Sequence, residues 1–159
     1  MIHGTYGSTV DSYLTLEDQR IDTTVVKANI RYLFKFTNDL TKTVKYCYGK
    51  KFVHKDRYVR NAFLHNTTEN LLNYEINFKP YGYWKYEVYE VSWIGSVSLT
   101  EDTAPANETT VLPVHNSNGV VQGKVEEGKL YVTETVGSEQ VSYTEYSEND
   151  NDNNYLYTN

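Results

Sequence analysis

The chain has 159 residues, a formal net charge of −6 and 39% hydrophobic residues, with a mean hydropathy of −0.63. A chain of this length is expected to form one domain with a real core, and no apolar run approaches the roughly 20 residues that span a bilayer. The sequence begins without the basic start and apolar stretch of a secretory signal, and its single cysteine, Cys47, has no partner for an internal disulfide. We therefore expect a protein made and folded in the cytoplasm, with no membrane partner.

An extended N-terminal arm is expected before the first strand. Residues 1–28 are rich in Gly, Ser and Thr, with Tyr and Leu scattered among them. Residues 29–37 then alternate between two kinds of side chain, which is typical of a half-buried strand. One face of this strand carries Ile30, Tyr32, Phe34 and Phe36, and the other carries Arg31, Leu33 and Lys35.

A second strand is predicted over residues 42–49, after the turn residues 37–39. Its alternation places Val44, Tyr46 and Tyr48 on one face. Cys47 falls on the opposite, polar face or in a second layer. Without a base nearby in the sequence, we interpret Cys47 as a small packing residue rather than a nucleophile.

Two further strands, residues 57–65 and 72–78, lead into residues 81–93, which contain both Trp residues and four Tyr. Three interpretations of this aromatic stretch are open: a packed core strand, a sugar-binding platform, or a surface that docks on another protein. Trp84, Tyr86 and Val88 share a face without charges, which we predict to be core. The other face mixes aromatic side chains with Lys and Glu, and we expect it to be exposed and to form a partner interface. Its candidate contact residues are Tyr83, Tyr89 and Trp93.

Beyond residue 95 the composition becomes more polar. Residues 98–113 hold two of the three prolines and predict a long loop. Residues 120–136 predict two short strands separated by a turn at residues 126–128, and residues 140–147 predict one more strand.

The C-terminal end combines a polar spacer with an apolar anchor. Residues 148–154 are acidic and polar, and Tyr155, Leu156 and Tyr157 follow them. A disordered tail normally stays polar to its end, so we predict that these three residues bind a partner. The alternative is that residues 155–159 fold back on their own domain as an edge strand.

The predicted elements give an all-β protein, a single antiparallel β-sandwich of the immunoglobulin-like or jelly-roll-like kind with extended N- and C-terminal arms. The arm is assigned to residues 1–28, the sandwich to residues 29–147, and the acidic spacer with its apolar anchor to residues 148–159.

Charge is unevenly distributed along the chain. Residues 27–60 carry ten Lys/Arg against two Asp/Glu, whereas residues 101–159 carry two against eleven. The acidic end is therefore suited to meet the basic segment of the same molecule or of a neighbour. Lys and Arg interleaved with Tyr and Phe also occur on single-strand nucleic-acid platforms. A strand with one solvent-exposed face shows the same pattern. We therefore do not expect nucleic acid as a partner.

The sequence shows no pattern of residues that would carry chemistry. The four histidines lack metal-ligand spacing, and no phosphate-binding loop or nucleophile elbow is present. Asp150, Asp152 and Asn154 imitate the start of a calcium loop, but the Gly and Glu that such a loop requires further on are missing. We therefore expect no enzymatic activity, no catalytic residue, no metal and no cofactor.

Four segments, "RYLFKFTNDLTKTVKY", "DRYVRNAF", "GYWKYEVYE" and "EEGKLYV", occur in this order over residues 29–136. Their order and spacing resemble those of a small virion structural protein of tailed bacteriophages, found in marine and gut phages. The resemblance implies a β-sandwich of the capsid decoration or minor head type, located in the virion. Its implied partners are the major capsid protein, other virion structural proteins, or further copies of itself. Two alternatives stay open: a carbohydrate-binding sandwich that uses Tyr83, Tyr89 and Trp93, and a neck or tail adaptor.

Overall fold

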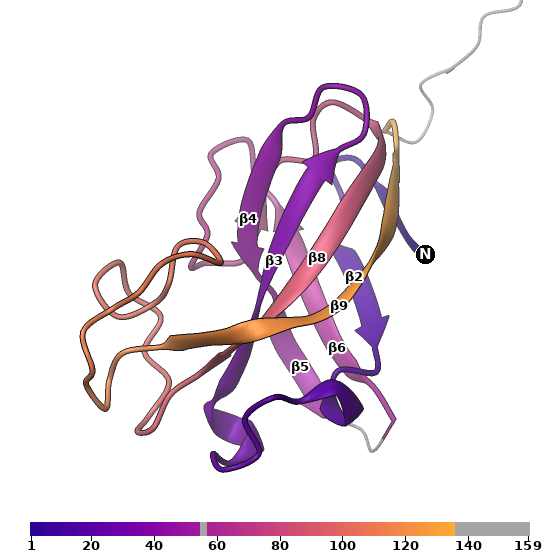
Figure 1. Ribbon diagram of the computed structural model, residues 1–159. Helices are drawn as coiled ribbons and strands as arrows, with labels where there is room; N and C mark the ends of the chain where they lie inside the picture. The colour runs from indigo at the N-terminus through magenta and orange to yellow at the C-terminus, as the bar shows by residue number, and fades with distance from the viewer. Residues whose placement is uncertain (55–56, 136–159) are drawn as a thin grey trace, which may run out of the picture.

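The computed structural model describes residues 1–54 and 57–135, in which two β-sheets pack face to face (Figure 1). The first sheet has five strands in the order β1-β9-β8-β3-β4, and the second follows the order β2-β6-β5, with the short β7 paired to β6. The strands are β1 (Ile2–Thr5), β2 (Val10–Leu14), β3 (Ile30–Asn38), β4 (Val44–Tyr48), β5 (Lys50–His54), β6 (Val59–His65), β7 (Glu75–Ile76), β8 (Gly82–Ser92) and β9 (Val120–Thr133). The predicted all-β sandwich is confirmed. Most of its pairings are antiparallel, but β1 pairs with β9, and β6 with β7, in parallel.

Helical structure in the described ranges is limited to two 3-10 turns, η1 (Glu17–Gln19) and η2 (Lys27–Asn29). Both lie in the connection between β2 and β3, at the lower end of the sandwich in Figure 1. Within these ranges, no helix is long and apolar enough to cross a membrane.

Aromatic side chains fill the space between the sheets. The alternation along β3 and β8 aims one face of each strand inward, because successive strand residues point to opposite sides. Phe34 of β3 packs edge-on against Phe63 of β6, with ring centroids 4.7 Å apart. Trp84 and Tyr86 of β8 are buried in the same core, as predicted. The Trp84 indole N–H donates to the Pro80 carbonyl at 3.1 Å, so its polar atom is paired as well.

The predicted N-terminal arm is wrong over the first fourteen residues. Residues 2–5 form β1, which extends the first sheet beside β9, and residues 10–14 form β2, which pairs with β6. Ile2 and Val10 are buried in the core between the sheets. Strands of four and five residues that each bury so few apolar side chains leave no visible alternation in the sequence. The pairing partners that stabilise them lie about 50 to 130 residues away along the chain.

The predicted turn at residues 126–128 is also wrong, because β9 continues through it as one strand of 14 residues. Gly128 does not form a turn; it allows the Tyr86 side chain to lie close to the backbone of β9. A Cβ atom at this position would lie 2.5 Å from the hydroxyl oxygen of Tyr86. Gly123 adopts a φ of 151°, close to one of two register shifts between β8 and β9. Irregular pairing of this kind increases the local twist of a sheet.

Two smaller expectations change in the structure. The strand predicted over residues 72–78 shortens to Glu75–Ile76, because Tyr74 has a φ of 65° and the Asn70 side chain closes a turn by accepting from the Leu72 amide. Cys47 points into the main core and not toward the polar face. Burial raises the pKa of its thiol, which fits the packing role that was predicted.

Candidate interaction surfaces

The three residues of the stretch 81–93 that were predicted to form an interface differ in their surroundings. Tyr83 is 53% exposed, Tyr89 is half-buried, and Trp93 has no exposed surface. The prediction that Trp93 is exposed is therefore wrong, and the three side chains do not form one open platform. Tyr155, Leu156 and Tyr157, the other candidate contact residues, lie outside the described residues.

Trp93 is buried because residues 94–119, here called the long loop, fold back over the outer face of the five-stranded sheet. A second hydrophobic cluster forms beneath the loop, separate from the core between the sheets. Its buried members are Leu33, Tyr48, Val91, Trp93 and Ala104.

Specific contacts hold the long loop against the sheet. The Tyr48 hydroxyl donates to the Pro105 carbonyl at 2.8 Å. Gly119 lies directly against the Trp93 indole, where a Cβ atom would come within 2.6 Å of the ring. The backbone N–H of Gly119 donates to the Thr103 carbonyl at 2.8 Å, which closes the base of the loop. These contacts join positions 16 to 57 residues apart, so local alternation does not reveal them.

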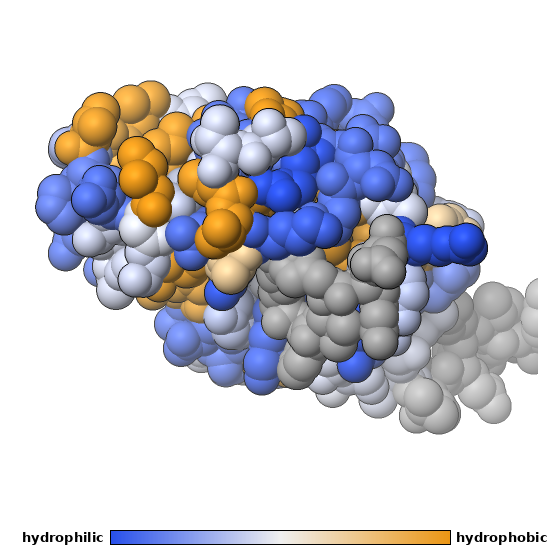
Figure 2. All heavy atoms as spheres, turned by 90° about the horizontal axis from the view of Figure 1, so that it is seen from below, coloured by the Kyte–Doolittle hydropathy of each residue, from blue (hydrophilic) through white to orange (hydrophobic). Residues whose placement is uncertain are grey.

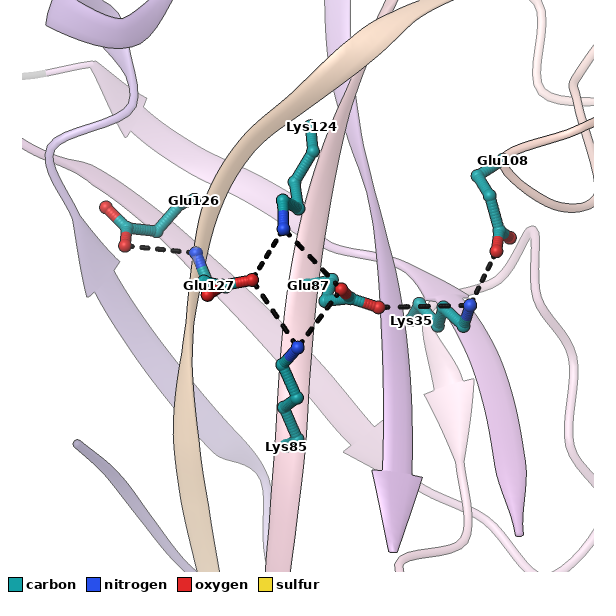
Figure 3. A network of polar contacts seen from close by, with 7 residues as sticks. All are labelled: Lys35, Lys85, Glu87, Glu108, Lys124, Glu126 and Glu127. Atoms are coloured by element: carbon teal, nitrogen blue, oxygen red, sulfur yellow. Dashed lines mark hydrogen bonds and ion pairs between the residues drawn. The ribbon is translucent and has the colours of Figure 1, made fainter. Parts of the chain in front are cut away.

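Next to the covered region, the outer face of the sheet carries a network of alternating charges, shown in Figure 3. The ammonium group of Lys124 lies 2.6 Å from the Glu127 carboxylate and 3.7 Å from that of Glu87. Lys85 bridges the same two carboxylates at 3.4 and 3.3 Å. These four residues stand on the neighbouring strands β8 and β9 and neutralise one another. Each such exposed pair contributes little to stability, but together they give this face a polar surface without a strong field of one sign.

Lys35 connects the network to the long loop. Its ammonium group lies 3.8 Å from Glu87 and 2.6 Å from Glu108, which is a loop residue. The hydrogen bond with Glu108 raises the pKa of Lys35. Partial burial by itself would raise the pKa of Glu108, but hydrogen bonds from Lys35 and Tyr46 bring that pKa below its ordinary value. Burial and the bond to Glu108 raise the pKa of Tyr46 to about 12.

Three aromatic rings form a row across β1, β9 and β8 on the same outer face. Tyr131 pairs in register with both His3 and Tyr83. The ring centroids of Tyr83 and Tyr131 lie 4.6 Å apart, and those of His3 and Tyr131 lie 6.4 Å apart. The sequence pattern indicates Tyr83 but not its two neighbours, because they belong to strands more than 40 residues away in the chain.

Exposed aliphatic side chains stand on the long loop, just before η2 and at the start of β9. We call this surface the apolar end and define it by Val26, Ile94, Val111, Val114 and Val120, which are all exposed. Val111 and Val114 are 92% and 97% exposed. Seen from below, hydrophobic residues gather on the side where Figure 1 shows the long loop (Figure 2).

Hydrogen bonds fix the backbone that presents the apolar end. The Gly95 amide donates to the Asn116 carbonyl at 2.9 Å, and the Asn118 side chain donates to the Pro113 carbonyl at 2.8 Å. The Trp93 amide donates to the Asn29 carbonyl at 3.0 Å, which brings the start of the long loop against η2. The composition of this segment predicts only a long loop. The stretch "VLPV" at residues 111–114 was the available signal.

In the described ranges, no group of three or more His, Cys, Asp or Glu side chains is placed to hold a metal ion. Asp150, Asp152 and Asn154, which resemble the start of a calcium-binding loop, lie outside these ranges. No protein-family model, no curated protein and no solved structure matches the chain.

Proposed function

We propose that the chain is a non-enzymatic structural subunit of a tailed-bacteriophage virion, of the capsid decoration or minor head type. In this proposal it binds other virion subunits, the major capsid protein among them, through its apolar end. The observation that carries the proposal is the exposure of Val111 and Val114 on a loop whose backbone is fixed by hydrogen bonds. The order of strand motifs over residues 29–136, which resembles that of phage virion proteins, supplies the class of particle.

Exposed aliphatic side chains on an ordered loop favour protein binding. Contiguous apolar patches on the surface of a protein mark interaction sites, whereas scattered single residues need no explanation. Burying one Val or Ile side chain contributes about 1.5–3 kcal/mol relative to leaving it exposed. The five side chains of the apolar end could therefore supply several kcal/mol to an interface.

The surroundings of the apolar end also fit an interface. Protein interfaces combine an apolar centre with a polar rim. The network of Lys35, Glu87 and Glu108 lies on the sheet beside the long loop, and its charges are compensated within the molecule. A partner that covers the apolar end and reaches this network would meet charges that are already paired within the molecule.

The location of the protein is the first test. Particles would be purified from a lysate of the host that carries this gene, analysed by mass spectrometry, and labelled with an antibody against the chain. We expect a constant copy number per particle and label on the head. Label on the neck or tail would replace the head assignment with an adaptor role. Absence of the chain from purified particles would refute the virion proposal as a whole.

The apolar end is tested with the double variant Val111→Ser/Val114→Ser, measured by retention on particles that lack the protein. Because two valines lose their burial, we expect binding at least about 100-fold weaker. The melting temperature should stay unchanged, because both side chains are exposed in the free protein. The matched control is Leu40→Ser, which alters a side chain 88% exposed in the connection between β3 and β4. Equal retention of both variants would exclude the apolar end as the binding surface.

The aromatic row of His3, Tyr131 and Tyr83 supports carbohydrate binding as a second candidate function. Sugar rings stack on exposed aromatic faces, and Lys85 and Lys129 occupy the next positions of β8 and β9 on the same side of the sheet. A glycan array screened with the wild type and with Tyr83→Ala separates the two functions. Binding that disappears in the variant would favour a carbohydrate-binding module, and silence across the array would exclude it.

A further inference from the structure

A second aromatic surface lies on the other sheet, away from the apolar end. Tyr13 of β2 is 58% exposed, and Tyr58, just before β6, is 38% exposed. Their rings meet edge to face with centroids 5.7 Å apart. The guanidinium group of Arg60 lies 6.0 Å from the Tyr13 ring, and Arg57 is exposed beside Tyr58 in the sequence. Tyr13, Tyr58 and Arg60 therefore stand together on the outside of the four-stranded sheet.

An open hollow adjoins Tyr13 where β1 and β2 bring the two sheets together. Its volume is about 250 Å³, and its lining is more polar than apolar. The lining residues are Met1, Ile2, His3, Asp11, Tyr13, Leu14 and Tyr86. A hollow of this size accommodates one large side chain such as Tyr, whose hydroxyl group suits a polar lining.

The charge of this sheet is positive. Four Lys/Arg and no Asp/Glu occur in residues 50–54 and 57–60. These ranges comprise β5, the residues just before β6 and the start of β6. Asp11 on β2 neutralises part of this charge, because its carboxylate accepts two hydrogen bonds from Arg60 at 3.1 and 2.9 Å. A partner for this surface should combine negative charge with one or two large apolar side chains.

The C-terminal segment of this same chain has that chemistry. Residues 136–159 carry five Asp/Glu and no Lys/Arg, and Tyr155, Leu156 and Tyr157 follow the acidic spacer. We propose that residues 148–159 dock on the surface of Tyr13, Tyr58 and Arg60, with one tyrosine of the C-terminal anchor in the adjoining hollow. This surface is separate from the apolar end, so the inference does not depend on the proposed function.

The chain is long enough for this docking. The Tyr6 amide, at the turn between β1 and β2, donates to the Thr133 carbonyl at 2.9 Å, so the end of β9 lies beside the start of β2. Residues 136–147 span up to about 40 Å when extended, and the five residues of β2 measure about 17 Å. The segment can therefore reach the tyrosine pair of its own molecule, and the same length also allows it to reach a neighbouring copy.

The contact is tested in the full chain by pairing Tyr13→Cys with Tyr157→Cys under mild oxidation. We expect a disulfide, either within one molecule or between two, and gel mobility shows which copy supplies the segment. The matched control pairs Tyr157→Cys with Tyr83→Cys, a similarly exposed tyrosine on the opposite sheet. Native Cys47 is buried and does not compete. Equal yields from the two pairs, or no disulfide from either, would overturn the proposal.

Limited proteolysis gives an independent readout. Cleavage within residues 148–159 should be at least about fivefold faster in Tyr13→Ala/Tyr58→Ala than in the wild type, because an aromatic anchor site is lost. Tyr83→Ala serves as the control and should leave the rate unchanged.

The variant Tyr155→Ser/Leu156→Ser/Tyr157→Ser removes the anchor without altering the sandwich. It should be cleaved as fast as the Tyr13→Ala/Tyr58→Ala variant. Raising the salt concentration should speed cleavage of the wild type, because ionic attraction is screened. Wild-type cleavage as fast as in both variants would refute the contact.

A basic aromatic surface also fits single-stranded nucleic acid, so the test includes it. A fluorescent oligonucleotide is titrated with the full chain and with the Tyr13→Ala/Tyr58→Ala variant. Under our proposal the wild type shows no specific binding, because its own acidic segment occupies the surface. Binding that the variant loses would assign the surface to nucleic acid and overturn the proposal.

Discussion

At the scale of single residues, both tryptophans are structural, although they serve different clusters. Trp84 belongs to the core between the sheets, and Trp93 belongs to the cluster beneath the long loop. Both are fully buried. The dense aromatic stretch of residues 81–93 thus serves mainly to fill two layers, one on each face of β8.

We expect Trp84→Ala and Trp93→Ala each to lower the free energy of unfolding by about 3–5 kcal/mol, the usual range for a buried large aromatic side chain. Urea unfolding followed by circular dichroism measures both losses. Tyr83→Ala is the control, because this exposed neighbour should change stability by no more than about 0.5 kcal/mol. A similarly small loss for Trp93→Ala would show that the long loop does not cover this position in solution.

Glu90 is a fully buried carboxylate with a clear structural role. Its two oxygens accept hydrogen bonds from the backbone amides of Ile21 and Asp22, at 2.9 and 2.8 Å. These bonds hold the connection between β2 and β3 against the end of β8.

Glu90→Ala should destabilise the protein by about 2–5 kcal/mol, because two amides lose their acceptor and an orphaned buried group costs about 1–3 kcal/mol. Glu90→Gln should cost less, because the amide oxygen can still accept one of the bonds. Thermal unfolding of both variants, with Glu101→Ala as an exposed control, measures the difference. A Glu90→Ala variant as stable as the control would contradict this role.

At the scale of elements, the long loop is the feature that decides which part of the outer sheet face stays open. It is joined to the sheet by the cluster around Trp93 and by the ion pair of Lys35 with Glu108. The ion pair crosses 73 residues of sequence. Because the pKa of Glu108 is lowered in the folded protein, the pair links stability to pH.

The sign of the dependence follows from the lowered pKa. Glu108 contributes stability above its ordinary pKa of 4.5, and this contribution is lost as the pH falls below 4.5 through the folded-state value. Glu108→Gln should therefore lose stability at pH 7 and show a shallower decline than the wild type below pH 4.5. Urea unfolding at a series of pH values tests this, with Glu126→Gln as the control carboxylate. Parallel curves for Glu108→Gln and the wild type would show that the pair does not contribute.

At the scale of the whole molecule, β1 and β2 close one side of the sandwich. The strands belong to different sheets and are joined by a short turn, and β1 covers the end of β9 from Leu130 to Thr133. Ile2 and Val10 complete the core at this side. The N-terminal residues are therefore part of the domain.

Deletion of residues 1–5 should lower the melting temperature clearly, because it removes a paired strand and the buried Ile2 side chain. Loss of a buried Ile alone costs about 2–5 kcal/mol when it is replaced by Ala, and the free edge of β9 should also promote association. Calorimetry and size-exclusion chromatography measure the two effects, and Met1→Ser is the control, because Met1 is exposed. A truncated protein that melts like the wild type would restore the interpretation of this segment as an arm.

The sequence by itself determined the fold class, the positions of β3 and β8, and the core faces of both strands. Alternation with a period of two is a local signal, and the inward residues Phe34, Phe36, Trp84 and Tyr86 are large enough to make it unambiguous. The short strand β1 and the continuous β9 escaped this signal. Their pairing depends on distant partners, and glycines that look like turn residues serve close packing instead.

Only the tertiary structure decided which outer-face residues are covered. Tyr83 of β8 and Trp93, the residue after β8, follow the same alternation, yet Trp93 is buried and Tyr83 is exposed. The difference comes from the long loop, which packs Ala104 and Pro105 against the sheet near Trp93 and leaves Tyr83 uncovered. The apolar end and the surface around Tyr13 and Tyr58 also depend on the tertiary structure, because each joins residues from segments far apart in the chain. Burial and shared surfaces are properties of the folded packing, and a local sequence pattern cannot encode them.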